Sequence, residues 1–370
     1  MPTYNIVSAD SHLNEPPELF KEVPQSLRQL VPQLISTEKG DAWVLAPGTD
    51  PRLVGTSAVA GRKKTEYLSK PVTYDTMRRG SFEPEPRLED MDIDHIDGDV
   101  LYPGIMRYME RFASGEVRLA CTQTYNEWLA GFCKYKPSRL VGVGVLPLLD
   151  DENGAAAVRT LHAARKLGLK TVFLPQKNGG MPLHHPDADK LWAVASEFEM
   201  PVSIHIQTNP FMRALPKDAL KIPGTRELMP VTSLVAMSEH LTLLVFGGVF
   251  MRHPKLKIVL AEGGIGWIPS VLERMDHVFH VHTPYMGSPI KELPSETFKR
   301  HCFATFQEDR AGIRLRDMMG VDNLMWASDY PHTDTTWPES KQVIDKTFAG
   351  VPELEKRKMV CDNAVRLYGF

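Results

Sequence analysis

Short apolar runs rich in β-branched residues alternate along the chain with longer segments whose apolar residues recur every three or four positions. Runs of the first kind predict buried strands, and those of the second predict amphipathic helices. The eight predicted strands comprise residues 5–9, 99–102, 140–146, 171–174, 201–205, 256–261, 301–305 and 323–327. The predicted helices between them include residues 117–132, 155–167, 188–198, 265–278 and 339–348. This alternation favours a parallel sheet covered by helices.

Polar side chains lie at the ends of several predicted strands. Their positions along the chain distinguish between two possible folds. An open, doubly wound sheet binds its ligand at one switch point near the first strand. Here the polar strand ends extend from Asp10 to Asp329, and a closed ring would bring them together. We therefore predict an α/β fold of the (β/α)8 TIM-barrel type, which carries its chemistry at the carboxyl ends of the strands.

Three strand ends carry residue types that bind metal ions. Asp10 and His12 lie two positions apart at the end of the first strand, so both side chains point to the same face. His205 ends the fifth strand, and Asp329 follows the eighth. Mixed histidine and carboxylate ligands suit zinc, manganese or ferrous iron better than calcium or copper. We predict that these four residues hold one divalent ion, with zinc as the first choice.

Two stretches do not fit the repeating unit of strand and helix. Residues 16–87 are rich in proline and glycine and follow the first strand without a clear helical period. We interpret them as an insertion that caps the barrel mouth, although a surface excursion fits equally well. Residues 208–230 form a proline-rich loop after the fifth strand, on the same side. We expect residues 1–370 to form one barrel domain, with these two segments walling its pocket.

The composition of the chain limits the kinds of partner and the cellular location that we expect for the protein. The 370 residues include 43 basic and 46 acidic ones, for a formal net charge of -3, which gives no electrostatic reason to expect a nucleic-acid partner. The four cysteines contain no Cys-x-x-Cys pair, so a reducing cytoplasm is the expected location. No apolar run is long enough to span a bilayer. We expect a soluble protein that acts on a small molecule and binds no membrane.

Other features of the sequence have simpler explanations. His277, His280 and His282 form a local cluster without a matching carboxylate or cysteine, and we assign them no metal. The glycines of residues 262–266 lack the Lys-Ser/Thr ending of a phosphate-binding loop, so close backbone packing explains them better.

Motifs spread over nearly the whole chain outside the insertion resemble one enzyme family. They are Asp10-x-His12 with Glu15-Pro16, Asn126-Glu-Trp-Leu with Pro137-Ser-Arg-Leu-Val-Gly-Val, Ile204-His205, Glu262-Gly-Gly-Ile-Gly-Trp-Ile-Pro and Ser328-Asp-Tyr-Pro-His332. The family is amidohydrolase-2, which includes aminocarboxymuconate-semialdehyde, resorcylate and carboxyvanillate decarboxylases and metal-dependent hydrolases. The motifs are more specific for the family than for one reaction.

The resemblance implies roles for individual residues. The family's first-strand His-x-His or Glu-x-His falls on Asp10 and His12, its fifth-strand metal histidine on His205, and its eighth-strand aspartate on Asp329. Asp10 departs from the pattern because its carboxylate is shorter. Glu262 departs as well, because decarboxylases of the family usually carry a catalytic histidine there. The resemblance also implies a homodimer.

Hydrolysis is the first expected reaction, because Glu262 would repel a substrate carboxylate unless it is protonated or paired. In that reaction Asp329 takes a proton from metal-bound water, and His332 or Glu262 protonates the leaving group of a small carbonyl-containing, carboxylated or aromatic substrate. Decarboxylation of a hydroxy-aromatic or unsaturated acid is the alternative, with Asp329 or His332 as the proton donor. A barrel that has lost catalysis is the third possibility. We expect a bound ion to lower the pKa of Asp329, and a neighbouring carboxylate to raise that of Glu262.

Overall fold

Eight parallel strands form one sheet in which each strand pairs with the next along the chain. The computed structural model describes residues 4–67, 69–177, 179–206, 214–216, 218–219, 222–225 and 227–370. The strands are β1 (Val7–His12), β5 (Gly98–Tyr102), β6 (Leu140–Val145), β7 (Thr171–Phe173), β8 (Val202–His205), β9 (Ile258–Ala261), β10 (Cys302–Phe306) and β11 (Leu324–Trp326). All eight strands predicted from the sequence are confirmed, with ends shifted by up to three residues.

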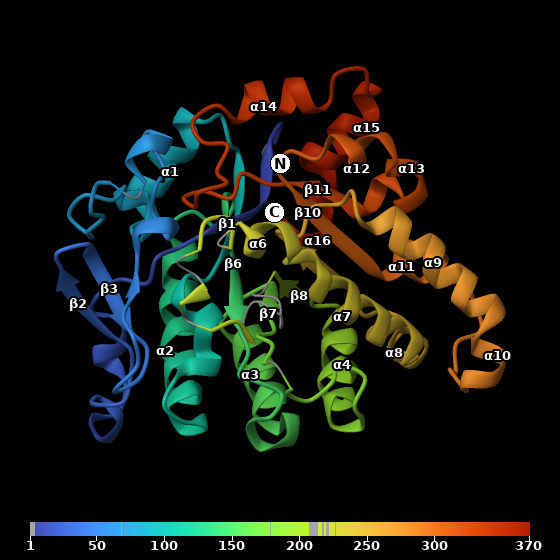
Figure 1. Cartoon of the computed structure of the whole chain (residues 1–370), viewed down its shortest axis with the longest axis horizontal. Helices are drawn as coiled ribbons and strands as arrows, with labels where there is room; N and C mark the ends of the chain where they lie inside the picture. Colours follow the sequence, from blue (N-terminus) through green and yellow to red (C-terminus); the bar gives the residue numbers. More distant parts are fainter. Residues whose placement is uncertain are drawn as a thin grey trace.

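The first and last strands lie beside each other, so the sheet is nearly closed into a barrel (Figure 1). The Asp329 amide donates to the Asp10 carbonyl oxygen over 3.0 Å. The Ser328 amide donates to the Ser8 hydroxyl, also over 3.0 Å. The ring therefore closes at the point where it brings Asp10 next to Asp329. This confirms the predicted barrel and excludes the open, doubly wound sheet.

The strands are continuously apolar because both faces of the sheet are covered. Every residue of β6 is buried, and helix α2 (Gly115–Lys134) packs on its outer face. A Cβ atom added to Gly142 would lie 2.6 Å from the side chain of Leu129 in this helix. Glycine is therefore required at this position, because any larger residue would push the helix off the sheet.

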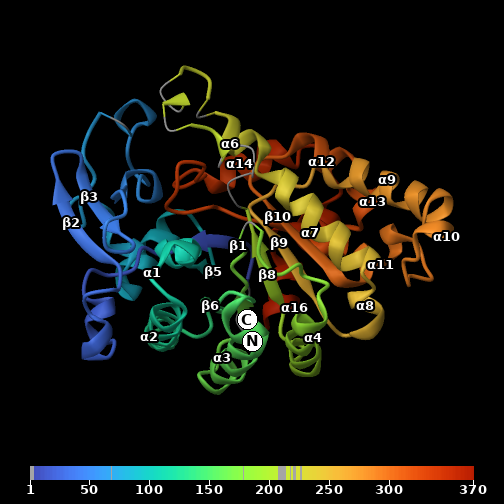
Figure 2. The same cartoon turned by 60° about the horizontal axis from the view of Figure 1, so that its bottom comes forward.

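Helices surround the strands, as Figures 1 and 2 show from two directions. The predicted helices are confirmed as α2, α3, α4, α9 and α14, with small shifts at their ends. Helix α9 begins three residues later than predicted, because the amides of Ile265 and Gly266 donate to Asp309 Oδ2 instead of entering the helix. The α-helices described, apart from α2, are α1 (Pro84–Ile93), α3 (Ala155–Lys166), α4 (Pro186–Phe198), α6 (Leu228–Thr232), α7 (Leu234–Phe246), α8 (Val249–Arg252), α9 (Ile268–Val281), α10 (Thr283–Met286), α11 (Pro294–His301), α12 (Arg310–Arg314), α13 (Arg316–Met319), α14 (Ser340–Thr347), α15 (Glu353–Arg357) and α16 (Asn363–Tyr368).

The insertion of residues 16–87 contains a small antiparallel sheet that the sequence did not predict. Its strands are β2 (Gln33–Thr37), β3 (Gly40–Val44) and β4 (Arg52–Leu53). The hairpin gives a weak apolar signal because β2 is mostly exposed and only β3 is buried. The amides of Val59 and Ala60 donate to the carbonyl oxygen of Pro331, in the loop after β11. These bonds attach the insertion to the end of the barrel where the polar strand ends lie.

Ten of the 23 residues of the second predicted wall of the pocket, residues 208–230, lie outside the described residues. Its last residues begin helix α6. Among the described residues, none of the helices combines the length and the apolar character needed to cross a membrane.

A buried ion pair fixes β1 against its neighbours. The Arg87 guanidinium donates to Asp99 Oδ2 from Nη2 at 2.8 Å and from Nε at 3.0 Å. It also donates to the Ser11 hydroxyl and to the carbonyl oxygen of His12. Arg87 is 1% exposed and Asp99 is 2% exposed. Helix α1, at the end of the insertion, is thereby tied to the strand that carries Asp10 and His12.

Arg87→Met should lower the free energy of unfolding by about 3–5 kcal/mol, because it leaves the Asp99 carboxylate buried without its cation. The midpoint of urea unfolding measures this effect. Arg79→Met is the matched control, since Arg79 and its partner Glu83 lie at the surface. A midpoint for Arg87→Met equal to that of the control would contradict the role given to this ion pair.

Candidate metal centre

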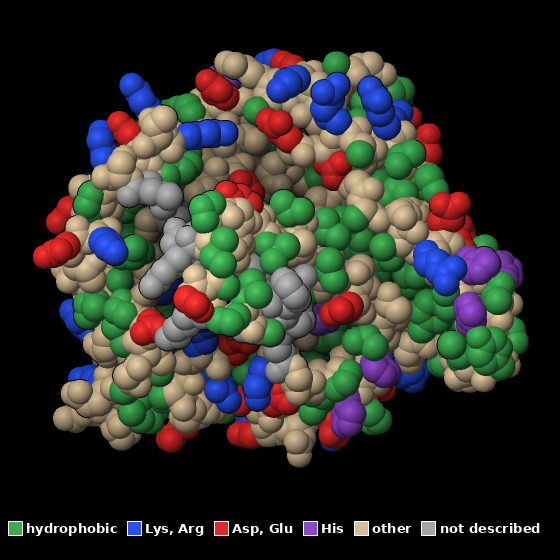
Figure 3. Space-filling model, viewed as in Figure 1, with side chains coloured by type: hydrophobic (Ala, Val, Ile, Leu, Met, Phe, Trp, Pro, Cys, Tyr) green, Lys and Arg blue, Asp and Glu red, His purple; other side chains and the backbone are tan. Residues whose placement is uncertain are grey.

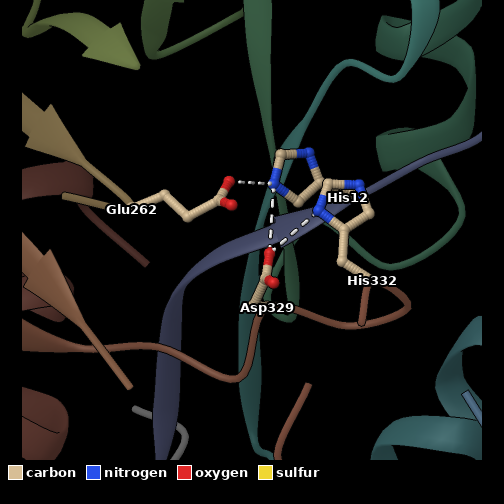
Figure 4. A group of neighbouring side chains, drawn as sticks. All are labelled: His12, Glu262, Asp329 and His332. Atoms are coloured by element: carbon tan, nitrogen blue, oxygen red, sulfur yellow. Dashed lines mark ion pairs between the residues drawn. The ribbon is translucent and has the colours of Figure 1, made fainter. Parts of the chain in front are cut away.

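Six polar side chains from four strand ends converge at the mouth of the barrel. They are Asp10 and His12 of β1, His205 of β8, Glu262 after β9, and Asp329 and His332 after β11. Every residue that the sequence assigned to a site therefore lies in one group. Figure 4 shows four of them, with the carboxylates and imidazoles turned towards one another.

The Nε2 atom of His12 is at the centre of the group. It lies 3.5 Å from Asp10 Oδ1 and 3.3 Å from Glu262 Oε2. It also lies 3.4 Å from Asp329 Oδ1. His205 Nε2 lies 2.9 Å from Glu262 Oε2 and 3.8 Å from Asp10 Oδ1. The oxygen and nitrogen atoms that bind metals in proteins thus surround one small volume.

These facing atoms are buried, and they lack hydrogen-bond partners. Asp10, His12 and Asp329 are 0% exposed, and His205 is 1% exposed. Asp10 Oδ1, His12 Nε2, His205 Nε2, Glu262 Oε2 and both Asp329 carboxylate oxygens have no hydrogen-bond partner. Burying charged groups without compensation costs several kcal/mol per group. A divalent cation among these atoms would compensate the buried carboxylates, so the donor set fits the predicted metal.

Hydrogen bonds at the far side of each ring orient the histidines. His12 Nδ1 lies 3.2 Å from the carbonyl oxygen of Pro103, and His205 Nδ1 lies 3.4 Å from that of Ile206. A carbonyl oxygen only accepts, so Nδ1 carries the hydrogen in both rings and Nε2 keeps its lone pair for a ligand. The His332 ring stacks on that of His12, with centroids 3.8 Å apart.

Thr305 on β10 connects two of the carboxylate residues. Its hydroxyl donates to Asp10 Oδ2 over 3.1 Å and accepts from the amide of Glu262 over 2.8 Å. Glu262 and Asp329 both have left-handed backbone conformations, with φ of 62° and 52°. Such conformations cost residues other than glycine about 1–3 kcal/mol and are commonly kept at functional sites. The strain turns both side chains into the barrel mouth.

The segment after β5 brings a cation to the group. The buried carboxylate of Glu15 accepts from the amides of Gly104, Ile105 and Met106, at 2.8–3.1 Å. These bonds fix the turn that carries Arg107. Arg107 Nη1 lies 3.6 Å from Glu262 Oε2. The sequence alone did not place Arg107 beside Glu262. The Glu15-Pro16 motif is the feature of the sequence that could have indicated the position of Arg107, because Glu15 holds the turn before it. No feature of the sequence indicated the role of Thr305.

Burial and neighbouring charges shift the pKa values of the group. Burial and Arg107 lower the pKa of His12 to about 4. Burial opposes protonation of His205, but Glu262 and Asp10 raise its pKa to about 9. Burial, with Glu262 and Asp10, holds the pKa of Asp329 well above its usual range. Burial raises the pKa of Glu262, but the charge of His205 holds it well below its usual range. Without a cation, the pKa of Asp329 is therefore raised and that of Glu262 is lowered. This is the reverse of the order expected when an ion is bound beside Asp329.

The histidine cluster near the end of α9 is separate from this centre. Figure 3 shows histidines gathered at the projecting end of α9 and α10. The rings of His277 and His282 are 6.3 Å apart. Within the part of the chain that the structure describes, neither they nor His280 belong to a group of three potential metal ligands.

His12→Ala and His205→Ala should each lose most of the bound metal, because each removes a buried nitrogen that faces the carboxylates. Elemental analysis after dialysis against metal-free buffer measures the content. His277→Ala removes a histidine outside the centre and should keep the full amount. Asp10→Ala should also lose metal, and full content in that variant would place Asp10 outside the ligand set. Full content in His12→Ala would contradict the centre itself.

Comparisons with known proteins identify the family of this chain. An amidohydrolase family model matches residues 9–370. A γ-resorcylate decarboxylase from Rhodococcus jostii is 26% identical over 299 residues, which cover 76% of this chain and 86% of the relative. The structure of an amidohydrolase from Mycobacterium avium subsp. paratuberculosis superposes with a TM-score of 0.81, at 20% identity, over 100% of both chains. The structure of 5-carboxyvanillate decarboxylase from Novosphingobium aromaticivorans superposes with a TM-score of 0.71, at 20% identity, over 99% of this chain and 96% of the other. That enzyme was crystallised with manganese and 4-hydroxy-3-methoxy-5-nitrobenzoic acid. The chain is therefore an enzyme of the amidohydrolase-2 family.

Proposed function

We propose that this protein is a metal-dependent, non-oxidative decarboxylase of a hydroxy-aromatic acid. This reverses the order expected from the sequence, which put hydrolysis first. The Rhodococcus jostii relative is named for the decarboxylation of γ-resorcylate, and the Novosphingobium aromaticivorans enzyme for that of 5-carboxyvanillate. The family likeness thus supports decarboxylation better than hydrolysis.

The observation that carries the proposal is the position of Arg107. The sequence favoured hydrolysis because an unpaired Glu262 would repel an acid. Glu262 Oε2 instead lies 3.6 Å from Arg107 Nη1, so this guanidinium offsets its charge. The guanidinium also presents fixed donors that suit a carboxylate. An anionic substrate can therefore approach this mouth.

We assign the ion to Asp10, His12, His205 and Asp329. When bound, it supplies a Lewis acid that binds and orients the hydroxyl and carboxylate oxygens of the substrate. We favour manganese over zinc, because carboxylate ligands suit manganese and manganese is present in the Novosphingobium aromaticivorans complex.

Asp329 is the residue that we assign to proton transfer. Decarboxylation requires that the ring carbon bearing the carboxylate gain a proton. The bond from this carbon to the carboxylate then breaks, its electron pair restores the aromatic ring, and carbon dioxide leaves. Arg107 Nη2 donates to His332 Nε2 over 3.5 Å, so the His332 hydrogen is on Nδ1, which lies 3.1 Å from Asp329 Oδ1. We assign His332 to relaying a proton from solvent to Asp329 after each turnover, in which Nε2 takes up one proton as Nδ1 gives one to Asp329.

We also propose that residues 16–87 wall the substrate pocket. Arg52 of β4 places its guanidinium carbon 3.7 Å from the centroid of the Tyr108 ring, beside Arg107. The insertion thus contacts the segment that carries the substrate-facing cation.

The homodimer implied by the family resemblance stays a prediction.

Manganese-loaded protein should release carbon dioxide from 2,6-dihydroxybenzoate or 5-carboxyvanillate. In deuterium oxide the product should carry one deuterium at the carbon that lost its carboxylate, because that carbon takes a proton exchangeable with solvent. Asp329→Asn should slow turnover by at least about 100-fold. Asp317→Asn makes the same chemical change at an exposed position and should leave turnover unchanged.

Other outcomes would replace the proposal. Hydrolysis of esters or lactones of the same acids, without release of carbon dioxide, would restore the hydrolase expected from the sequence. Full metal content with neither activity would favour a barrel that has lost catalysis.

A further inference from the structure

Glu262 lies closer to both metal-facing histidines than Asp10 does. Its Oε2 is 2.9 Å from His205 Nε2 and 3.3 Å from His12 Nε2. For Asp10 Oδ1 the same two distances are 3.8 Å and 3.5 Å. The residue that stands in the place of a catalytic histidine thus occupies the position of a ligand.

These separations match a coordination sphere. Two donor atoms about 2.1 Å from one ion lie about 3.0 Å apart when their bonds form a right angle, and about 3.4 Å apart at the tetrahedral angle. Both distances from Glu262 Oε2 to the histidine nitrogens are near this range. The oxygen is buried and has no hydrogen-bond partner, as expected of an atom that faces an ion.

The environment of Asp10 explains why another oxygen is needed. Asp10 Oδ2 accepts from the Thr305 hydroxyl, so only Oδ1 faces the histidines. The same hydroxyl holds the amide of Glu262, whose side chain then extends from its strand end towards His12 (Figure 4). The Asp10 side chain is shorter, and its Oδ1 stays farther from both histidine nitrogens. The longer Glu262 side chain brings an oxygen closer to them.

We propose that Glu262 is a direct ligand of the metal ion, in a set of three carboxylates and two histidines. This rests on the proposed function only in requiring that the centre bind metal. Three carboxylates and a divalent ion leave one negative charge, which Arg107 offsets from 3.6 Å. Five protein ligands, three of them carboxylates, suit manganese or ferrous iron better than the four-coordinate geometry typical of zinc. Glu262 is then unavailable as the acid expected in hydrolysis, and decarboxylation has no leaving group that needs one.

Titration with manganese(II) tests this assignment, with the free ion measured by its paramagnetic resonance signal. The unmutated protein and Glu308→Gln should each bind one equivalent with the same affinity. Glu308 is an exposed glutamate at the same end of the barrel, after β10. Glu262→Gln should bind at least about 100-fold more weakly, because partners outside the ligand shell already contribute 10–100-fold. A smaller loss would place Glu262 outside the shell and overturn the assignment.

A second measurement uses the unmutated protein and does not depend on how the variant folds. All glutamates are labelled with ¹³C at the carboxyl carbon, and the manganese-loaded protein is studied by electron–nuclear double resonance. Among the proposed ligands only Glu262 is a glutamate, so a strong ¹³C coupling identifies its bond to the ion. Absence of this coupling would overturn the assignment.

Neither measurement requires turnover, so the two proposals can fail separately. A protein that binds manganese through Glu262 but releases no carbon dioxide would overturn only the proposed function. A decarboxylase without the ¹³C coupling would overturn only the ligand assignment.

Discussion

The structure depends on carboxylates and imidazoles that are held together in a buried barrel mouth without hydrogen bonds to their facing atoms. Asp10, Glu262 and Asp329 face two imidazole nitrogens, and their facing atoms have no hydrogen-bond partners. Such a group is unfavourable unless a cation compensates it. The closure of β11 onto β1, the ion pair of Arg87 with Asp99 and the strained backbone of two carboxylate residues all hold these atoms in place. Much of the fold at this end of the barrel thus positions a site that needs a positive ion.

The same electrostatic argument extends to the substrate. A mouth with three carboxylates would exclude an acid if nothing offset them. Glu15 binds the backbone of the turn before Arg107, and this turn places the guanidinium beside Glu262. Arg107 thus offsets part of the negative charge at the mouth, as the proposed decarboxylation of an acid requires. The identity of residue 262 alone does not reveal this neighbouring cation, which is why the sequence put hydrolysis first.

The sequence was sufficient for the barrel, and the six polar side chains that it singled out lie close together in the structure. Buried parallel strands are continuously apolar, and a closed ring brings Asp10 and Asp329 together although they lie far apart along the chain. The hairpin of β2 and β3 was missed because β2 is mostly exposed. Thr305 gave no signal, because its hydroxyl links Asp10 to the backbone of Glu262 only in three dimensions. Sequence supplied the type of residue 262 but not its distance from His205, and that distance decides between an acid and a ligand.

The central claim is that these strand ends hold one metal ion. Anomalous diffraction from crystals grown with manganese, measured above and below the manganese absorption edge, tests this claim most directly. The account predicts a single strong peak about 2.0–2.3 Å from oxygen or nitrogen atoms of Asp10, His12, His205, Glu262 and Asp329. A main peak elsewhere, for example beside His277 and His282, or no peak at the barrel mouth, would contradict it.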